Sequence, residues 1–222
     1  MARMPQRPLQ TAFSPRCGAR FAAPAAILLF ALLLLASGCG QHAKLAPLPA
    51  DAVVLAFGDS LTYGTGASES ESYPAQLAAL AGRRVVREGV PGEVSAVGLQ
   101  RLPAALDEYR PRLMVLCHGG NDFLRRLPKA EAAANVRAMV RLAKDRGIDV
   151  VLLGTPEFGF LLTPADFYAE IAKEFRIPYE GEVLSKILRD SNLKSDQIHP
   201  NAAGYRLMAQ RVYELLKKSG AL

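Results

Sequence analysis

Four short segments of the chain hold the residue types that could carry out a reaction. Residues 58–61, Gly-Asp-Ser-Leu, contain a serine hydroxyl, and residues 119–122, Gly-Gly-Asn-Asp, contain a carboxamide. Residues 90–93, Val-Pro-Gly-Glu, offer a glycine amide, and residues 196–201, Asp-Gln-Ile-His-Pro-Asn, contain a carboxylate and an imidazole. A hydroxyl, an imidazole, a carboxylate and amide donors are the groups that acyl transfer through a serine requires.

Ser60 is the candidate nucleophile, and a turn serine is the alternative. A serine hydroxyl attacks only when a neutral imidazole takes its proton, and an acceptor must hold that imidazole in the correct tautomer. Asp196 lies three positions before His199, so one tight turn can bring the two side chains together. The backbone N–H groups of Ser60 and Gly92 and the amide of Asn121 can bind the developing oxyanion.

Polar residues beside these segments are expected to have structural roles. Asp59 is predicted to brace the turn, and His118 to be a polar residue at the end of a strand. Cys117 follows an apolar run and is expected to be a buried thiol. Thr62 stands where the nucleophile elbow of α/β-hydrolases has its second glycine, which excludes that template.

The elements that must position these residues alternate between short apolar runs and longer amphipathic stretches. The runs predict strands at residues 53–57, 84–87, 113–117, 150–153 and 177–179. Helices are predicted at residues 72–81, 95–106, 131–146, 164–174, 183–189 and 201–218. The alternation predicts the α/β class, as a flavodoxin-like three-layer sandwich around a five-stranded parallel sheet. The strands of such a sheet end at one edge, where the four segments would meet.

Taken together and in this order, "GDSL", "GGND" and "DxxHPN" resemble the SGNH, or GDSL, hydrolase family over nearly the whole chain after residue 50. The resemblance implies the SGNH hydrolase fold, with Ser60 as the nucleophile and Asp196 and His199 completing the triad. It also implies Gly92 and Asn121 as oxyanion donors. No metal or organic cofactor is implied.

The segments "LKSDQIHPNAAGYRLMAQRV" and "RLPAAL" are most similar to the periplasmic arylesterase, acyl thioesterase and lysophospholipase subgroup. This resemblance implies hydrolysis of aryl and acyl esters, and also of acyl thioesters or lysophospholipids, through an acyl-enzyme. Arg87 and Glu88 depart from the pattern, because the family usually has Asn and a small residue there. A polysaccharide O-acetyl deacetylase and a non-catalytic envelope lipoprotein are the alternative readings.

The segment after the fourth predicted strand is where substrate selection is expected. Phe158, Phe160, Leu161 and Leu162 form an apolar run there, which could wall a pocket for an acyl chain together with Tyr63. The alternative is a loop that folds down into the core. The expected substrate is therefore a small-molecule acyl ester or a lipid.

Charge gives no indication of a nucleic-acid partner. The chain has 27 Lys and Arg against 21 Asp and Glu, but four of the arginines lie in residues 1–23. Without them the net charge is about +2. Arg125, Arg126 and Lys129 follow the Gly-Gly-Asn-Asp segment and could attract an anionic head group, with a solvated basic face as the alternative.

The first 38 residues have the pattern of an export signal, with a basic start, an apolar run and small residues before Cys39. The box "LASGC" resembles the lipobox of bacterial lipoproteins, which implies a signal peptide over residues 1–38 and lipidation of Cys39. Residues 39–50 then form a tether, and residues 51–222 the hydrolase domain. We expect a monomeric lipoprotein held by its lipid anchor in the bacterial cell envelope, facing the periplasm, at the outer membrane. An ordinary secreted protein and a retained signal anchor are the alternatives.

Overall fold

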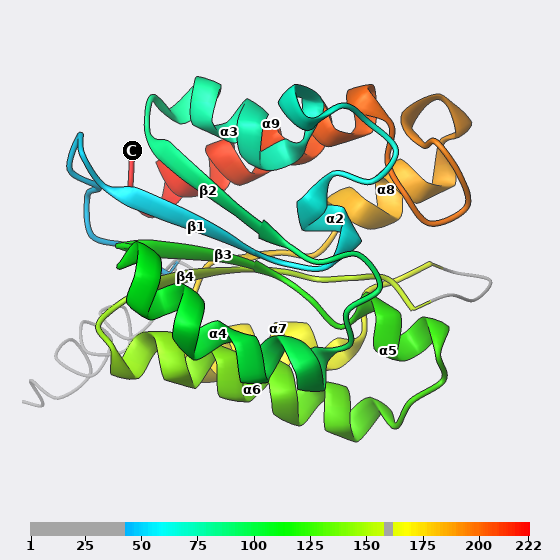
Figure 1. Cartoon of the computed structure of the whole chain (residues 1–222), viewed down its shortest axis with the longest axis horizontal. Helices are drawn as coiled ribbons and strands as arrows, with labels where there is room; N and C mark the ends of the chain where they lie inside the picture. The colour runs from blue at the N-terminus through cyan, green and yellow to red at the C-terminus, as the bar shows by residue number, and fades with distance from the viewer. Residues whose placement is uncertain (1–42, 158–161) are drawn as a thin grey trace, which may run out of the picture. The chain divides into compact units, whose positions relative to one another are not determined.

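The computed structural model describes residues 43–157 and 162–222, in which parallel strands alternate with helices (Figure 1). One sheet contains all five strands in the order β2-β1-β3-β4-β5, and every neighbouring pair is parallel. The strands are β1 (Val53–Gly58), β2 (Arg84–Gly89), β3 (Leu113–Cys117), β4 (Asp149–Leu153) and β5 (Tyr179–Glu180). The predicted α/β class and five-stranded parallel sheet are confirmed.

The central strands are apolar on both faces because helices cover both sides of the sheet. Val54 and Ala56 of β1 belong to one core cluster, and the alternating Leu55 and Phe57 belong to the other. Every residue of β3 is buried. The continuous apolar runs of the sequence are therefore strands at the centre of a three-layer sandwich.

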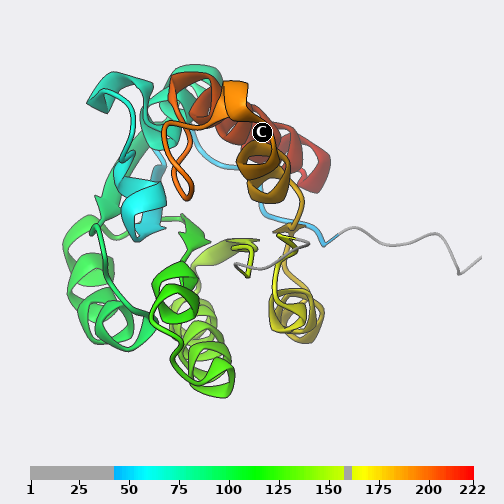
Figure 2. The ribbon, with the colours of Figure 1, turned by 90° about the vertical axis from the view of Figure 1, so that its right-hand side faces the viewer.

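Two sets of helices cover the two faces, as Figures 1 and 2 show. The first set packs on the face that carries Val54 and consists of α3 (Tyr73–Ala81), α8 (Val183–Arg189) and α9 (Ala202–Ser219). The second set packs on the opposite face and consists of α4 (Ser95–Tyr109), α6 (Lys129–Asp145) and α7 (Asp166–Phe175). These helices lie close to the predicted ranges, and the three-layer arrangement is confirmed.

The structure differs from the expected elements in its short helices and in its last strand. Four short helices were not predicted: α2 (Ser60–Tyr63), α5 (Gly120–Leu124), and the 3₁₀ turns η2 (Glu69–Glu71) and η3 (Ser191–Leu193). The last strand begins at Tyr179 instead of residue 177. Pro178 lacks an N–H to donate, and only its carbonyl takes part, accepting the Leu152 N–H at 3.0 Å.

The beginning and end of the described chain lie together. The N–H of Leu45 donates to the carbonyl of Ser219 at 2.9 Å, and that of Leu48 donates to Ala221 at 2.8 Å. Leu48 is part of the core, so packing starts within the predicted tether, before residue 51. Within residues 43–157 and 162–222, no helix has the length and apolar character needed to cross a membrane.

Candidate active site

Ser60 lies where β1 ends and α2 begins. Gly58 ends the strand, and Asp59 caps the helix by accepting the Leu61 N–H on Oδ1 at 3.1 Å. Figure 1 shows α2 and α5 at the same end of the sheet, which is the carboxyl end of the strands. The serine hydroxyl thus occupies the edge at which parallel sheets place their ligand sites.

Ser60, His199 and Asp196 form one hydrogen-bonded chain. The Oγ of Ser60 lies 3.0 Å from Nε2 of His199, and Nδ1 of the same ring lies 2.8 Å from Oδ2 of Asp196. Because Nδ1 faces a carboxylate, it carries the ring proton and leaves Nε2 free to accept the hydroxyl hydrogen. The structure thus brings together Ser60, His199 and Asp196, the three residues that the sequence pattern combines into a triad.

The loop before α9 fixes the His–Asp pair. Residues 194 and 200 form an antiparallel bridge, and the Ser195 N–H donates to the carbonyl of His199 at 2.9 Å. Oδ1 of Asp196 accepts the N–H groups of Ile198 and His199, each at 2.8 Å. The carboxylate is therefore held by the backbone of its own turn while Oδ2 faces the imidazole.

Asp196 has a lowered pKa although part of its side chain is buried. Burial raises the pKa of this carboxyl, but the hydrogen bonds from the His199 ring and from the backbone N–H groups of Ile198 and His199 outweigh it. The carboxylate stays ionised, which suits a group that orients an imidazole.

A tight turn at residues 90–93 presents Gly92. The N–H of Glu93 donates to the carbonyl of Val90 at 3.2 Å, and Gly92 has a φ of +76°. A proline followed by a glycine of positive φ is typical of a type II turn, and other residues are strained there. Among the described residues, the N–H groups of Ser60 and Gly92 meet no acceptor. Both remain available to bind an oxyanion.

The amide of Asn121 already has acceptors within the protein. Its Nδ2 donates to the carbonyl of Glu93 at 3.0 Å and to Oδ2 of Asp59 at 3.3 Å. Asp59 is completely buried, and burial raises the pKa of its carboxyl above the usual value although the hydrogen bond from the Leu61 N–H acts against it. These bonds tie the side chain of Asn121 to the strand end that carries Ser60.

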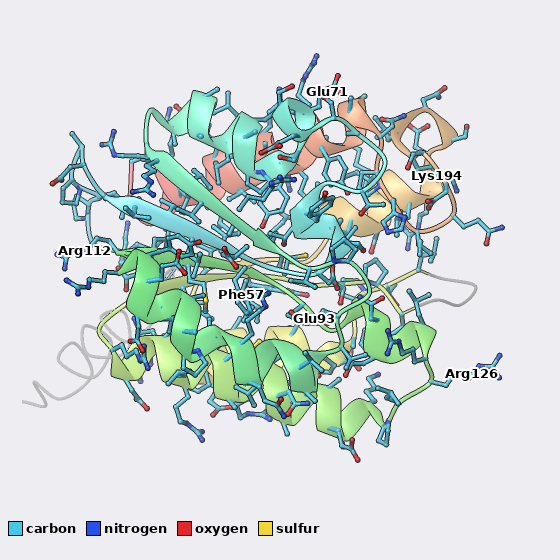
Figure 3. All side chains as sticks on the ribbon, viewed as in Figure 1. Phe57, Glu71, Glu93, Arg112, Arg126 and Lys194 are labelled. Carbon is cyan, nitrogen blue, oxygen red and sulfur yellow. The ribbon has the colours of Figure 1, made fainter. Side chains whose placement is uncertain are left out.

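A partly buried ionic network that the sequence reasoning missed is built around Glu93, the residue after Gly92. Arg101 of α4 donates to the carboxylate of Glu93 from Nε at 3.0 Å and from a terminal nitrogen at 2.9 Å, and it also binds Glu88. Its guanidinium lies 4.1 Å from the ring centre of Phe57. Figure 3 labels Phe57 and Glu93 between the sheet and the lower helices. Glu88, which departs from the family pattern, therefore has a partner.

His118 directly follows β3, as predicted for a polar residue at the end of a strand, and it completes this network. Its Nδ1 accepts the Gly119 N–H at 2.9 Å, so Nε2 carries the proton and donates to Glu93 Oε1 at 3.1 Å. Burial raises the pKa of Glu93, but the hydrogen bonds from His118 and Arg101 outweigh it and leave the pKa lowered. No local motif links Arg101 to Glu93, so only the tertiary structure reveals the network.

Asp122, the last residue of the Gly-Gly-Asn-Asp segment, has a structural role. Asp122 accepts the backbone N–H of Ser95 at 2.8 Å and its hydroxyl at 2.7 Å, and so caps α4. Cys117 is buried, as predicted. No group of His, Cys, Asp and Glu in the described ranges is arranged to hold a metal ion.

Part of the predicted substrate wall can be located. Tyr63 is 46% exposed, and the guanidinium of Arg87 lies 4.7 Å from its ring centre. Leu162 packs against the core, which is the alternative reading for that position. Phe158, Phe160 and Leu161, like the lipidation candidate Cys39, lie outside the described residues.

Two hollows lie away from the Ser60 hydroxyl. Their volumes are about 660 and 1230 Å³, and both lie between α7 and α9 beside β5. Neither is lined by Ser60, His199 or Asp196. Ser60 therefore lies at an edge of the sheet that these two hollows do not reach.

Comparison with known proteins places these features in a family. The family model described as "GDSL-like Lipase/Acylhydrolase family" matches residues 56–207. Esterase TesA of Pseudomonas aeruginosa is 32% identical over 197 residues, which are 83% of this chain and 97% of that protein. An Escherichia coli K12 protein named thioesterase 1/protease 1/lysophospholipase L1 is 29% identical over 162 residues, covering 67% of this chain and 75% of its own length.

A solved structure agrees in fold and sequence. The structure of AlinE4, an SGNH-hydrolase family esterase, matches with a TM-score of 0.60 and 32% identity, over 76% of this chain and 96% of AlinE4. Residues 56–207, which the family model matches, include the segments that carry Ser60 and His199. The chain therefore belongs to the GDSL-like lipase/acylhydrolase family and is a serine hydrolase of esters.

Proposed function

We propose that this protein hydrolyses carboxylic esters through an acyl-enzyme on Ser60, with His199 as the general base and Asp196 as the group that orients it. One observation carries the proposal: the hydrogen-bonded chain from Asp196 through His199 ends at the hydroxyl of Ser60, whose own N–H, like that of Gly92, meets no acceptor among the described residues. A nucleophile, its base and oxyanion donors at one point are what ester hydrolysis requires.

Acylation begins with attack of Ser60 Oγ on the ester carbonyl carbon, while the hydroxyl proton passes to Nε2 of His199. The carbonyl oxygen becomes an oxyanion and binds the N–H groups of Ser60 and Gly92. The bond to the leaving alkoxide then breaks, and the imidazolium returns its proton to that oxygen. An alcohol leaves, and the acyl group remains on Ser60.

Deacylation repeats the sequence with water as the nucleophile. His199 takes a proton from the water, the resulting hydroxide attacks the acyl carbon, and the same N–H groups bind the oxyanion. Collapse of this intermediate returns the proton to Ser60 Oγ and releases the carboxylic acid. Each step needs only protons that His199 holds or releases, so the cycle runs without a cofactor.

Asn121 is proposed as the third oxyanion donor. Its longer bond, 3.3 Å to Asp59 Oδ2, is the one that an incoming oxyanion would compete with, while the 3.0 Å bond to the carbonyl of Glu93 keeps the side chain in place. A long bond is weaker than one near 2.9 Å, so exchanging it costs less.

The proposed substrates are aryl and acyl esters, acyl thioesters and lysophospholipids. Relatives named esterase and thioesterase 1/protease 1/lysophospholipase L1 support this range. The proposed wall for the acyl chain includes Phe158, Phe160 and Leu161. Each buried methylene adds about 0.8 kcal/mol, or roughly fourfold in kcat/KM. A series of p-nitrophenyl esters should therefore gain kcat/KM from acetyl to about octanoyl. A maximum at acetyl would favour the deacetylase instead.

The proposed location is the bacterial cell envelope, facing the periplasm at the outer membrane, with the chain anchored through a lipid on Cys39. The basic start, the apolar run and the "LASGC" box of the leader support it. Stable anchoring needs more than one acyl chain, and a lipoprotein carries a diacylglyceryl group on the cysteine sulfur.

The nucleophile is tested by Ser60→Ala. This variant should lose esterase activity and labelling by a fluorophosphonate, while the thermal midpoint changes little because the hydroxyl makes one hydrogen bond at a half-buried position. Ser70→Ala, at an exposed position in η2, is the matched control and should keep both. Labelling that persists in Ser60→Ala would refute the assignment.

A further inference from the structure

We propose that Arg125 is a positioning residue of the oxyanion turn, which holds Gly92 so that its N–H faces the reacting carbonyl. The inference rests on the proposed function, because the turn binds an oxyanion only in that reaction. Arg125 itself does not touch the substrate. Its basis is one contact: a terminal nitrogen of the Arg125 guanidinium donates to the carbonyl oxygen of Gly92 at 2.7 Å. This short, charge-assisted bond joins α5 to the glycine of the turn.

The turn is anchored at several points, and most of them lie at its ends. At the start, the N–H of Val90 donates to the carbonyl of Gly58 at 3.1 Å. At the end, the carbonyl of Glu93 accepts Asn121 Nδ2, and its carboxylate is bound by Arg101 and His118. Among the described residues, the side chain that binds the peptide of the glycine itself is Arg125.

Gly92 benefits from this support because glycine restrains its own backbone less than other residues do. It lacks a Cβ, and at a φ of +76° the two peptide planes that it joins can rotate at little steric cost. The N–H proposed to bind the oxyanion lies in one plane, and the carbonyl that Arg125 holds lies in the other. An oxyanion donor lowers the barrier only when it is aligned before the reaction.

Arg125 also couples the two donors that come from different segments. It follows Asn121 by four positions at the end of α5, and its N–H donates to the carbonyl of Asn121 at 3.0 Å. Side chains four apart project from the same face of a helix. One turn of α5 therefore presents the amide of Asn121 to Glu93 and the guanidinium of Arg125 to Gly92. In this way it fixes the positions of the two proposed oxyanion donors, Asn121 and Gly92, relative to each other.

Arg126 offers a matched control within the same loop. Its side chain extends outward from the molecule in Figure 3, and in the described part of the chain it makes no hydrogen bond or ion pair. Arg125 and Arg126 are both exposed and carry the same charge. Replacing each by alanine removes one positive charge near the site, and only the first change removes the bond to Gly92.

The test uses the full-length chain in a non-ionic detergent with p-nitrophenyl butyrate, a neutral ester. Arg125→Ala should lower kcat about tenfold with KM within about twofold, less than the roughly 100-fold cost of losing a donor outright. Added guanidinium at millimolar concentration should restore part of kcat, and methylammonium should not. Arg125→Lys should fall between Arg125→Ala and the wild type. The fluorophosphonate should inactivate Arg125→Ala more slowly by about the same factor as kcat, and Arg126→Ala should match the wild type.

Other outcomes would overturn the inference. An unchanged kcat in Arg125→Ala, or a higher KM alone, would mean that Arg125 does not align the turn. A lower kcat that guanidinium does not restore, with a lower thermal midpoint, would mean that Arg125 supports the fold instead. A wild-type chain inert to both the ester and the fluorophosphonate would refute the proposed function, whereas an active wild type matched by Arg125→Ala refutes the role of Arg125 alone.

Discussion

Glu93 links the buried charges to the proposed oxyanion donors through two parts of one residue. Its carboxylate is bound by Arg101 and His118, and its backbone carbonyl accepts the amide of Asn121. Gly92 directly precedes it. A buried acidic residue thus fixes the position of the proposed oxyanion donors.

The first prediction concerns this link. Glu93→Gln keeps the shape of the side chain but loses the charge, and hydrogen bonds to charged groups contribute more than neutral ones. We expect the free energy of unfolding at pH 7 to fall by about 2 kcal/mol, measured by urea titration.

The pH dependence of that loss follows from the lowered pKa of Glu93. A carboxyl whose folded pKa lies below its usual 4.5 adds stability above that value and loses it as the pH falls through the folded pKa. The wild type and Glu93→Gln should therefore converge in stability as the pH drops below about 4.5. A difference that stays constant over the same range would show that the charge of Glu93 is not its cause.

The second prediction concerns Asn121. If its amide is the third donor, Asn121→Ala should lower kcat by about 100-fold, or about 3 kcal/mol, because the oxyanion loses a preorganised hydrogen bond. KM should change little, since the ground-state carbonyl makes a weaker bond than the oxyanion. Steady-state kinetics on an aryl ester measure both constants. A rise in KM at constant kcat would identify Asn121 as a substrate-binding group.

At the scale of elements, helix caps hold the proposed catalytic residues in place. Asp59 caps α2 and so fixes Ser60, while Asn201 caps α9 by accepting the Gly204 N–H at 3.0 Å. Nδ2 of Asn201 also donates to the carbonyl of Asn192 at 2.9 Å. Asn201 therefore joins the end of the loop that carries His199 both to α9 and to Asn192, which lies before the histidine.

The third prediction follows from this cap. Asn201→Ala should lower the free energy of unfolding by about 1 kcal/mol through loss of the N-cap, and kcat should fall because the histidine loop loosens. Asn201→Asp keeps the capping oxygen and loses only the Nδ2 donor, so its thermal midpoint should lie closer to that of the wild type. Equal losses for both variants would assign the stabilisation to Nδ2 rather than to the cap.

The sequence predicts the strands that are buried on both faces of the sheet. It misses the short helices and the contacts between residues far apart in the chain. The strand at residues 113–117 is predicted at its observed bounds, because an uninterrupted apolar run can only be a central strand here. Helix α2 has 4 residues and α5 has 5, which is too short for a periodic pattern. The hydroxyl, imidazole and carboxylate were recognisable from short motifs. The Arg101 network and the contact of Arg125 were not, because they join residues that only packing brings together.

At the scale of the whole molecule, the predicted signal peptide and Cys39 form the proposed membrane anchor. The fourth prediction is that Cys39→Ser blocks incorporation of a labelled fatty acid and leaves the protein unprocessed at this site or soluble. Cys17→Ser, which changes a cysteine within the predicted signal peptide, should keep the label. Wild-type protein found unlabelled in a soluble periplasmic fraction would contradict the lipoprotein assignment.

The backbone pairing of Leu45 with Ser219, and of Leu48 with Ala221, has a consequence for engineering. These bonds lie at the end of the sheet where β1 begins, and Ser60 lies at the end where β1 stops. Because the two ends of the described chain are neighbours, a short linker can join them and a new opening can be cut in a surface loop to give a circular permutant. A surface support or a fused reporter attached near Leu45 or near Ser219 would leave the end of the sheet that carries Ser60 open to solution.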